Sequence, residues 1–164
     1  MFAALTAALA MTLTTSGAAS QNDESRWIGQ FRLTPTANGC TLVRALQPID
    51  PSINIILLVE TYREGLMVGM FDTRLLNVLD DDQYYTAELF FDDERLTQAM
   101  MGVQKEPTSR GLLAVWEERE PMLSKLASAR VVRIMQGEAV VTGAEIDGLT
   151  EAVAELRMCH ARAD

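Results

Sequence analysis

Two cysteines, Cys40 and Cys159, constrain the fold of this 164-residue chain more than any other feature of the sequence. A bond between them would close a loop of about 120 residues. Loop-closure entropy alone would then stabilise the folded state by about 4–5 kcal/mol and hold an early segment against the last one. Such a bond needs an oxidising compartment, because reducing compartments keep thiols free.

The first twenty residues indicate which compartment the chain enters. Residues 1–20 carry no charge, contain an apolar run from Phe2 to Leu13, and end in Ala-Ala-Ser. This is the layout of a secretory signal peptide with small residues at its cleavage site. Threonine and serine interrupt the apolar run, whereas a membrane span needs about 20 strongly apolar residues. We therefore expect a signal peptide at 1–20 and a periplasmic or secreted protein, in preference to an N-terminal helix or an uncleaved anchor.

In an exported chain, two cysteines form a single disulfide by default. The residues before Cys159 fit this role, because apolar positions recur there every three or four residues, as on one face of a helix. That face comprises Leu149, Ala152, Val153, Leu156, Cys159 and His160. Cys40 opens a strand-like segment, CTLVRAL. We therefore predict a disulfide between Cys40 and Cys159, and a last-turn His160 that favours the helix dipole when charged.

Most of the remaining chain has the pattern of β-strands. Segment 54–61 is a continuous apolar run rich in β-branched residues, and segment 66–71 follows it across a glycine-containing turn. Further strands are expected at 26–34, 84–91, 95–104 and 111–116, and a late hairpin turns at Gln136–Gly137. Two helices are expected, at 120–129 and at 149–160.

These elements predict one domain over residues 21–164 with a mainly β, α+β fold. We expect an antiparallel β-sandwich or a curved sheet with the C-terminal helix packed on it. A doubly wound α/β fold is disfavoured, because helical patterns do not alternate with the strands.

The same layout carries a resemblance to known proteins. Trp27 and Cys40 lie on early strands of an exported chain, and the hairpin segment RVVRIMQGEAVV precedes the helical segment AEIDGLTEAVAELRMC. This arrangement is similar to small exported proteins of alphaproteobacteria and loosely resembles the invasion-associated locus B family of secreted β-sandwich proteins. The similarity is best in the last third of the chain and rests on hydrophobic spacing. It implies an exported β-rich module and brings no catalytic residue with it.

The neighbouring Cys159 and His160 raise the question of catalysis or metal binding. Adjacent residues diverge by about 100° around a helix, so these two side chains are poorly placed to share a proton. A serine triad needs a histidine as base, and the sequence has one His and no G-x-S-x-G elbow. Structural zinc needs four ligands, which one His and two distant cysteines do not supply. We therefore assign no catalytic residue and no metal ligand, and we expect no cofactor.

Acidic residues offer further candidate sites for calcium binding or hydrolysis, but their pattern is not specific. Asp80–Asp82 and Asp92–Glu94 could offer oxygen ligands to calcium, but the spacing of an EF-hand loop is missing. Glu88 and Glu117 could serve a small carboxylate-dependent hydrolase, which needs two carboxyl groups across the scissile bond. Any two of 23 acidic residues can be paired in this way, so this pattern decides little.

Methionine usage suggests one more site. Met67 with Met70, and the doublet Met100–Met101, could bind Cu(I) through their thioethers. If 66–71 is a strand, however, Met67 and Met70 point to opposite faces. Methionine more often fills gaps in a core, and we expect that use here.

The net charge of −9 bounds the possible partners. Nucleic acids and anionic membranes are unattractive to such a chain, which also has no basic cluster to contact phosphates. We expect a non-enzymatic module that binds another envelope protein or supports the envelope, without membrane insertion after signal cleavage. The alternatives are an acidic inhibitor or capture protein for a basic envelope enzyme, and the small hydrolase.

Overall fold

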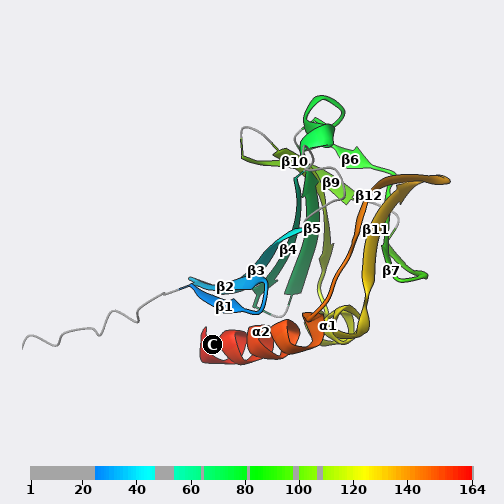
Figure 1. Cartoon of the computed structure of the whole chain (residues 1–164). Helices are drawn as coiled ribbons and strands as arrows, with labels where there is room; N and C mark the ends of the chain where they lie inside the picture. Colours follow the sequence, from blue (N-terminus) through cyan, green and yellow to red (C-terminus); the bar gives the residue numbers. More distant parts are fainter. Residues whose placement is uncertain are drawn as a thin grey trace, which may run out of the picture.

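The computed structural model describes residues 25–46, 54–63, 65–80, 82–97, 100–106 and 109–163. These residues form a large and a small antiparallel sheet, with two helices across one end of both (Figure 1). The predicted mainly β fold with a C-terminal helix packed on the strands is therefore confirmed. The predicted signal peptide, residues 1–20, lies outside the described residues.

The large sheet has eight strands, and its central strands come from the most apolar segments of the chain. Segments IILLV and LMVGMF have apolar residues on both faces, as strands inside a structure do. In spatial order the strands are β1 (Arg26–Ile28), β2 (Phe31–Thr36), β3 (Gly39–Leu46), β4 (Ile55–Tyr62), β5 (Gly65–Asp72), β10 (Ser109–Trp116), β9 (Met100–Glu106) and β6 (Tyr84–Tyr85).

The small sheet has four strands and packs on one face of the large one, which we call the inner face (Figure 1). Its order is β12 (Ala139–Glu145), β11 (Val131–Gln136), β7 (Glu88–Phe91) and β8 (Glu94–Thr97). Strands β11 and β12 form the predicted hairpin, with Gly137 at a φ of 60° in the turn. A positive φ is accessible to glycine at little cost, which explains this turn.

Three segments predicted as single strands are each divided in two. Segment 26–34 turns at Gly29, whose φ of 57° makes a hairpin of β1 and β2. Segment 84–91 contributes β6 to the large sheet and then β7 to the small sheet. Segment 95–104 crosses in the opposite direction, from β8 in the small sheet to β9 in the large sheet. The alternation of apolar and polar residues is the same in both sheets, so sequence pattern alone does not show where a chain changes sheet.

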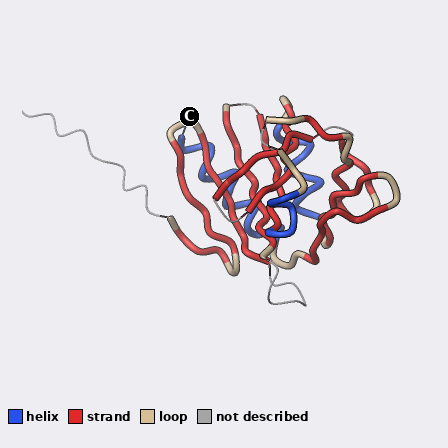
Figure 2. Tube along the Cα trace, turned by 90° about the horizontal axis from the view of Figure 1, so that it is seen from above, coloured by secondary structure: helices blue, strands red, loops and turns tan. Residues whose placement is uncertain are grey.

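The two helices close the end of the molecule where the sheets diverge. Helix α2 (Leu149–Ala163) packs mainly on β2 and β3, and helix α1 (Arg119–Ser128) packs beside it. Seen from above in Figure 2, both helices lie across the far end of the strands. The apolar face predicted for α2 is buried over its whole length, from Leu149 to His160. Within the described parts of the chain, no helix is long and apolar enough to cross a membrane.

A buried carboxylate links the two sheets. Asp72 ends β5 and caps the short 3-10 helix η1 (Thr73–Asn77), where it accepts a hydrogen bond from the Arg74 backbone at 2.9 Å. Its carboxylate pairs with the Arg74 guanidinium and accepts a 3.0 Å hydrogen bond from Thr142 on β12. Burial by itself raises the pKa of Asp72. The hydrogen bonds from Arg74 and Thr142 and the charge of Arg74 outweigh burial and hold that pKa below its ordinary value of 3.8.

The lowered pKa of Asp72 predicts an acid-dependent loss of stability. A carboxylate with a depressed folded-state pKa stabilises the fold above its unfolded-state pKa, and this stabilisation is lost as the pH falls through the folded-state value. Urea unfolding at a series of pH values should therefore show the unfolding free energy falling below about pH 4.

The Asp72→Asn variant should lose about 1–3 kcal/mol at neutral pH and show a smaller further loss in acid. Asp93→Asn, which removes a fully exposed carboxylate, should keep the wild-type acid dependence. An equal acid dependence in the wild type and the Asp72→Asn variant would contradict the proposed role of Asp72.

Candidate functional site

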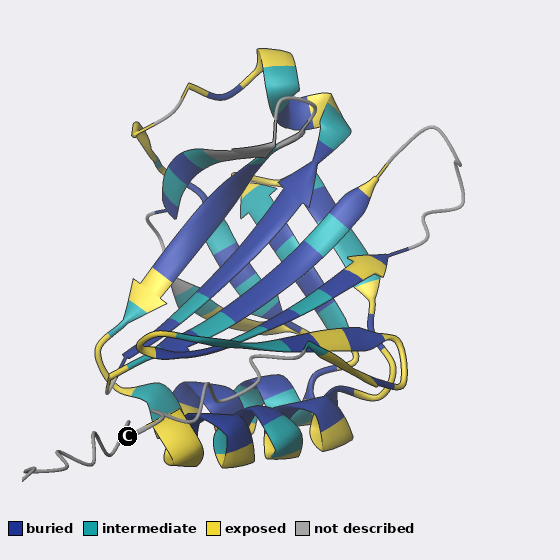
Figure 3. Cartoon of the chain, turned by 90° about the vertical axis from the view of Figure 1, so that its left-hand side faces the viewer, coloured by how far each residue is buried: buried dark blue, intermediate teal, exposed yellow. Residues whose placement is uncertain are grey.

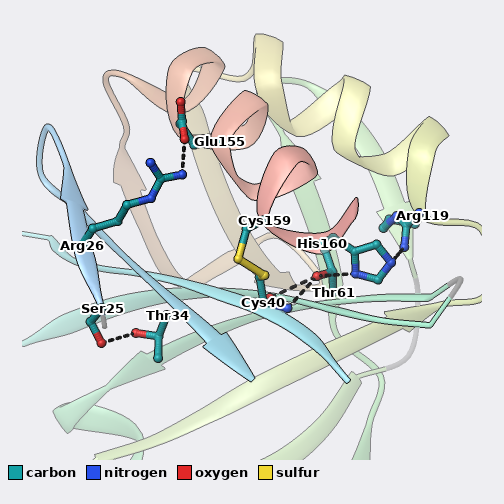
Figure 4. Close-up of a disulfide and its surroundings, with 9 residues drawn as sticks. All are labelled: Ser25, Arg26, Thr34, Cys40, Thr61, Arg119, Glu155, Cys159 and His160. Carbon is teal, nitrogen blue, oxygen red and sulfur yellow. Dashed lines mark hydrogen bonds and ion pairs between the residues drawn. A yellow bond between two sulfur atoms is a disulfide. The ribbon is translucent and has the colours of Figure 1, made fainter. Parts of the chain in front are cut away.

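The disulfide between Cys40 and Cys159 joins β3 to α2 across the core. The sulfur atoms are bonded, the Cα atoms lie 6.1 Å apart, and both residues are buried. Figure 4 shows the bond between the end of the helix and the strand below it. The predicted disulfide is therefore confirmed, and neither cysteine is a free thiol.

The hydroxyl of Thr61 completes this junction from the neighbouring strand β4. Its Oγ1 accepts a 3.0 Å hydrogen bond from the Cys40 backbone N–H and donates to the Cys40 carbonyl at 3.2 Å. The Nδ1 atom of His160 lies 3.1 Å from the same oxygen. Thr61 is fully buried, so these bonds satisfy polar groups that would otherwise be costly to bury.

The partners of His160 determine the tautomer of its ring. Arg119, at the start of α1, points a guanidinium N–H at Nε2 of His160 (Figure 4). An arginine only donates, so Nε2 must be the acceptor and the ring proton must sit on Nδ1. Nδ1 then donates to Thr61, whose own proton goes to the Cys40 carbonyl. These contacts link Arg119 to Cys40 through His160 and Thr61 and give both ring nitrogens of His160 a partner.

This arrangement gives His160 a different role from the one predicted. We predicted a last-turn histidine that favours the helix dipole when charged. His160 does lie in the last turn of α2, but its side chain is 2% exposed and hydrogen-bonded to Thr61 on β4. The reason is its position on the buried face of α2, directly after the cysteine. Both ring nitrogens have protein partners and the adjacent sulfur is oxidised, so the pair serves packing and has no nucleophile to activate.

Ion pairs hold the exposed side of α2 in place. Arg26 on β1 pairs with Glu155, and Arg157 donates to Glu120 of α1 at 2.9 Å. Such exposed pairs are individually worth about 0–1 kcal/mol, so they orient the helix more than they stabilise it.

A shallow depression lies where the chain enters α1. Its volume is about 300 Å³, and it is lined by Glu117, Glu118, Arg119, Glu120 and Pro121. The three glutamates are exposed, whereas Arg119 is mostly buried and turned toward Arg63 and His160. The depression therefore presents carboxylates to solvent.

Glu88 and Asp92, two of the acidic candidates, make structural contacts. Glu88, on β7, pairs with Arg95 on β8 at 3.0 Å, and Glu117 lies in the loop before α1. Asp92 accepts hydrogen bonds from the backbone of Arg130 and Val131 at 3.0 and 2.9 Å. In the described ranges, no three His, Cys, Asp or Glu side chains come together as metal ligands.

The methionines lie as the strand pattern predicted. Met70 is fully buried in the main core, whereas Met67 lies on the opposite face of β5. The doublet is divided in the same way, with Met100 buried in the main core and Met101 half-buried. Neither pair directs two sulfur atoms to one point on the strand.

Sequence reasoning missed one feature, the apolar outer face of the large sheet. Leu58, Phe71 and Leu113 form a second hydrophobic cluster, and Val43, Ile56, Met67 and Val103 pack against it. Figure 3 looks onto this face, and no described helix or strand lies over its centre. The continuous apolar run IILLV already carried the signal, because such runs are typical of strands covered on both faces.

Strand register aligns one row of side chains across the outer face. From β1 to β6 the row contains Trp27, Arg32, Val43, Leu58, Gly69, Leu113, Met101 and Tyr84. The terminal aromatics are largely exposed, Trp27 at 70% and Tyr84 at 78%. Paired residues point to the same face of a sheet, so the row crosses all eight strands and is uncharged except at Arg32.

No family model, curated protein or solved structure matches this chain. The resemblance to the invasion-associated locus B family therefore stays a prediction.

The buried hydroxyl of Thr61 gives a sharp test of the disulfide junction. Thr61→Val keeps the shape but leaves the Cys40 backbone and His160 without their partner, so unfolding free energy should fall by about 1–3 kcal/mol. Thr61→Ser keeps the hydroxyl and loses one methyl group, worth about 0.8 kcal/mol. Urea unfolding of oxidised protein measures both, and a larger loss for Ser than for Val would rule out this role of the hydroxyl.

The cysteines should behave as one unit in the same measurement. Cys40→Ser and Cys159→Ser should each cost about 2–5 kcal/mol, and the double variant should cost little more than either, because one bond is lost in every case. Additive losses would show that the bond itself contributes little.

Proposed function

We propose that this chain is an exported, non-enzymatic protein-binding module that contacts another protein of the cell envelope through the outer face of its large sheet. The observation that carries the proposal is the apolar, charge-poor character of that face. Antiparallel sheets with a solvated face normally alternate apolar and polar residues, and exposed apolar patches mark binding surfaces. On this face Leu58, Phe71 and Leu113 are 6%, 2% and 6% exposed at the centre, and Val115 is 55% exposed beside them.

Charge distribution supports this surface. Among the outward side chains described on the eight strands, only Arg32 and Glu60 are charged, in a chain with 23 acidic and 14 basic residues. Interface centres are depleted of charge and enriched in aromatic residues and methionine. The outer face follows this composition, with Phe71 near its centre and methionines on β5 and β9.

The disulfide supports the exported part of the proposal. The bond joins the chain's two cysteines, and disulfides of this kind persist in the periplasm or outside the cell. Residues 1–20 have the layout of the signal peptide that would direct the chain there. The protein recovered from cell envelopes should accordingly start near Gln21, which N-terminal sequencing would determine. An envelope protein that begins at Met1 would contradict cleavage.

Site-specific photo-crosslinking in cells tests the binding surface. Val115 on the outer face and Val140 on β12 are both strand valines, exposed at 55% and 59%. A photoreactive residue in place of Val115 should give a discrete crosslinked protein, whereas one in place of Val140 should give none. Equal or absent crosslinking from the two positions would exclude the outer face as the binding surface.

A further inference from the structure

Arg44 on β3 is a buried cation that has no acidic partner among the described residues. It is 8% exposed and lies on the same face of β3 as Cys40, the face that packs on α2. Its guanidinium carbon lies 5.2 Å from the centroid of the Phe31 ring, and its Nη1 donates to the Asp147 carbonyl at 2.7 Å. None of the ion pairs between described residues includes Arg44, and its buried Nε has no acceptor there. Burial of an unpaired charge is costly, so a counter-charge at this point would stabilise the fold.

The start of helix α2 adds unpaired donors beside this guanidinium. The Ala152 N–H donates to the Gly148 carbonyl at 3.2 Å, which is the first bond of the helical pattern. The N–H groups of residues 149–151 precede that bond, and they donate to no described acceptor. Free N–H groups and the positive end of the helix dipole together favour an anion at this position.

Phe31 and Asp147 bring the guanidinium and the helix start together. A Cβ on Gly148 would lie 3.9 Å from the Phe31 ring, the same ring that lies against Arg44. Asp147, whose carbonyl binds Arg44, is two residues before the first residue of α2. Asp147 and Gly148 are exposed, so this corner of the molecule is open to solvent.

We propose that this corner binds a carboxylate, carried by a small molecule or by the C-terminus of a peptide. The two oxygens of a carboxylate match the parallel N–H groups of a guanidinium, and Asp147 occupies only Nη1 of Arg44. Asp147 and Glu151 place exposed carboxylates at the same helix end, which disfavours a doubly charged ligand such as phosphate. The corner lies on the inner side of the large sheet, so this proposal and the one for the outer face stand or fall separately.

Amide NMR of the isotope-labelled, oxidised protein tests this site, with sodium acetate replacing sodium chloride at constant ionic strength and pH 7. Acetate should shift the amide signals of residues 148–151 along one saturable curve. Arg44→Met removes the charge and keeps an apolar side chain, and it should weaken acetate binding by about tenfold or more. Arg133→Met is the matched control. Arg133 also lies over a phenylalanine ring and has a buried Nε without a described acceptor, but it pairs with Asp93, so its loss should leave the acetate response unchanged.

Further ligands distinguish the sources of the carboxylate. Tetra-alanine that binds more tightly than acetate, while its C-terminal amide does not bind, supports a peptide C-terminus. Tetra-alanine that binds no more tightly than acetate supports a small molecule. If Arg44→Met does not fold, Arg44→Lys keeps the charge without the planar fork and should also weaken acetate binding. Shifts that do not saturate, shifts that persist without Arg44, or tighter binding of phosphate than of acetate would overturn the proposal.

Discussion

The bond between Cys40 and Cys159 is the constraint on which the rest of this structure depends. It holds the last helix against the third strand of the large sheet, across 119 residues of sequence. Thr61 and His160 add hydrogen bonds at the same point, so covalent and polar contacts fix α2 on one register of the sheet. With α2 in place, the inner face of the large sheet is covered by α2 at one end and the small sheet at the other (Figure 1).

The outer face of the large sheet is apolar although the described helices and the small sheet cover only the inner face. Strands β4 and β5 carry apolar residues on both sides, yet the described elements cover only one side. Leu58, Phe71 and Leu113 at the centre of the uncovered side are 6%, 2% and 6% exposed, so the apolar area that this side exposes lies mainly in the side chains around them, such as Val115 at 55%. The disulfide and the buried Asp72 therefore stabilise the inner side of the sheet, and the outer side is the surface that we propose for a partner.

Sequence reasoning reached the features that depend on local pattern. The disulfide was predicted from two cysteines in a chain that begins with a predicted signal peptide. The buried face of α2 was predicted from its spacing, and the opposite faces of Met67 and Met70 were predicted from strand alternation. Sequence reasoning did not predict that segment 84–91 is divided between two sheets, because β6 and β7 continue the same alternation of apolar and polar residues. The contact of His160 with Thr61 also lay beyond it, since that contact joins residues 99 positions apart. The continuous run IILLV indicated that β4 has apolar residues on both faces. Such a run does not show which of the two faces other elements of the fold cover.

Hydroxyl-radical footprinting of methionine oxidation tests the central claim most directly. Met67 and Met101 lie on the outer face, whereas Met158 lies on α2 and is 45% exposed. In protein labelled inside intact envelopes, the outer-face methionines should be oxidised several-fold less than in dilute purified protein, and Met158 should be oxidised equally in both. Equal oxidation of Met67 and Met101 in the two samples would show that the outer face is bare in its native setting and would contradict this account.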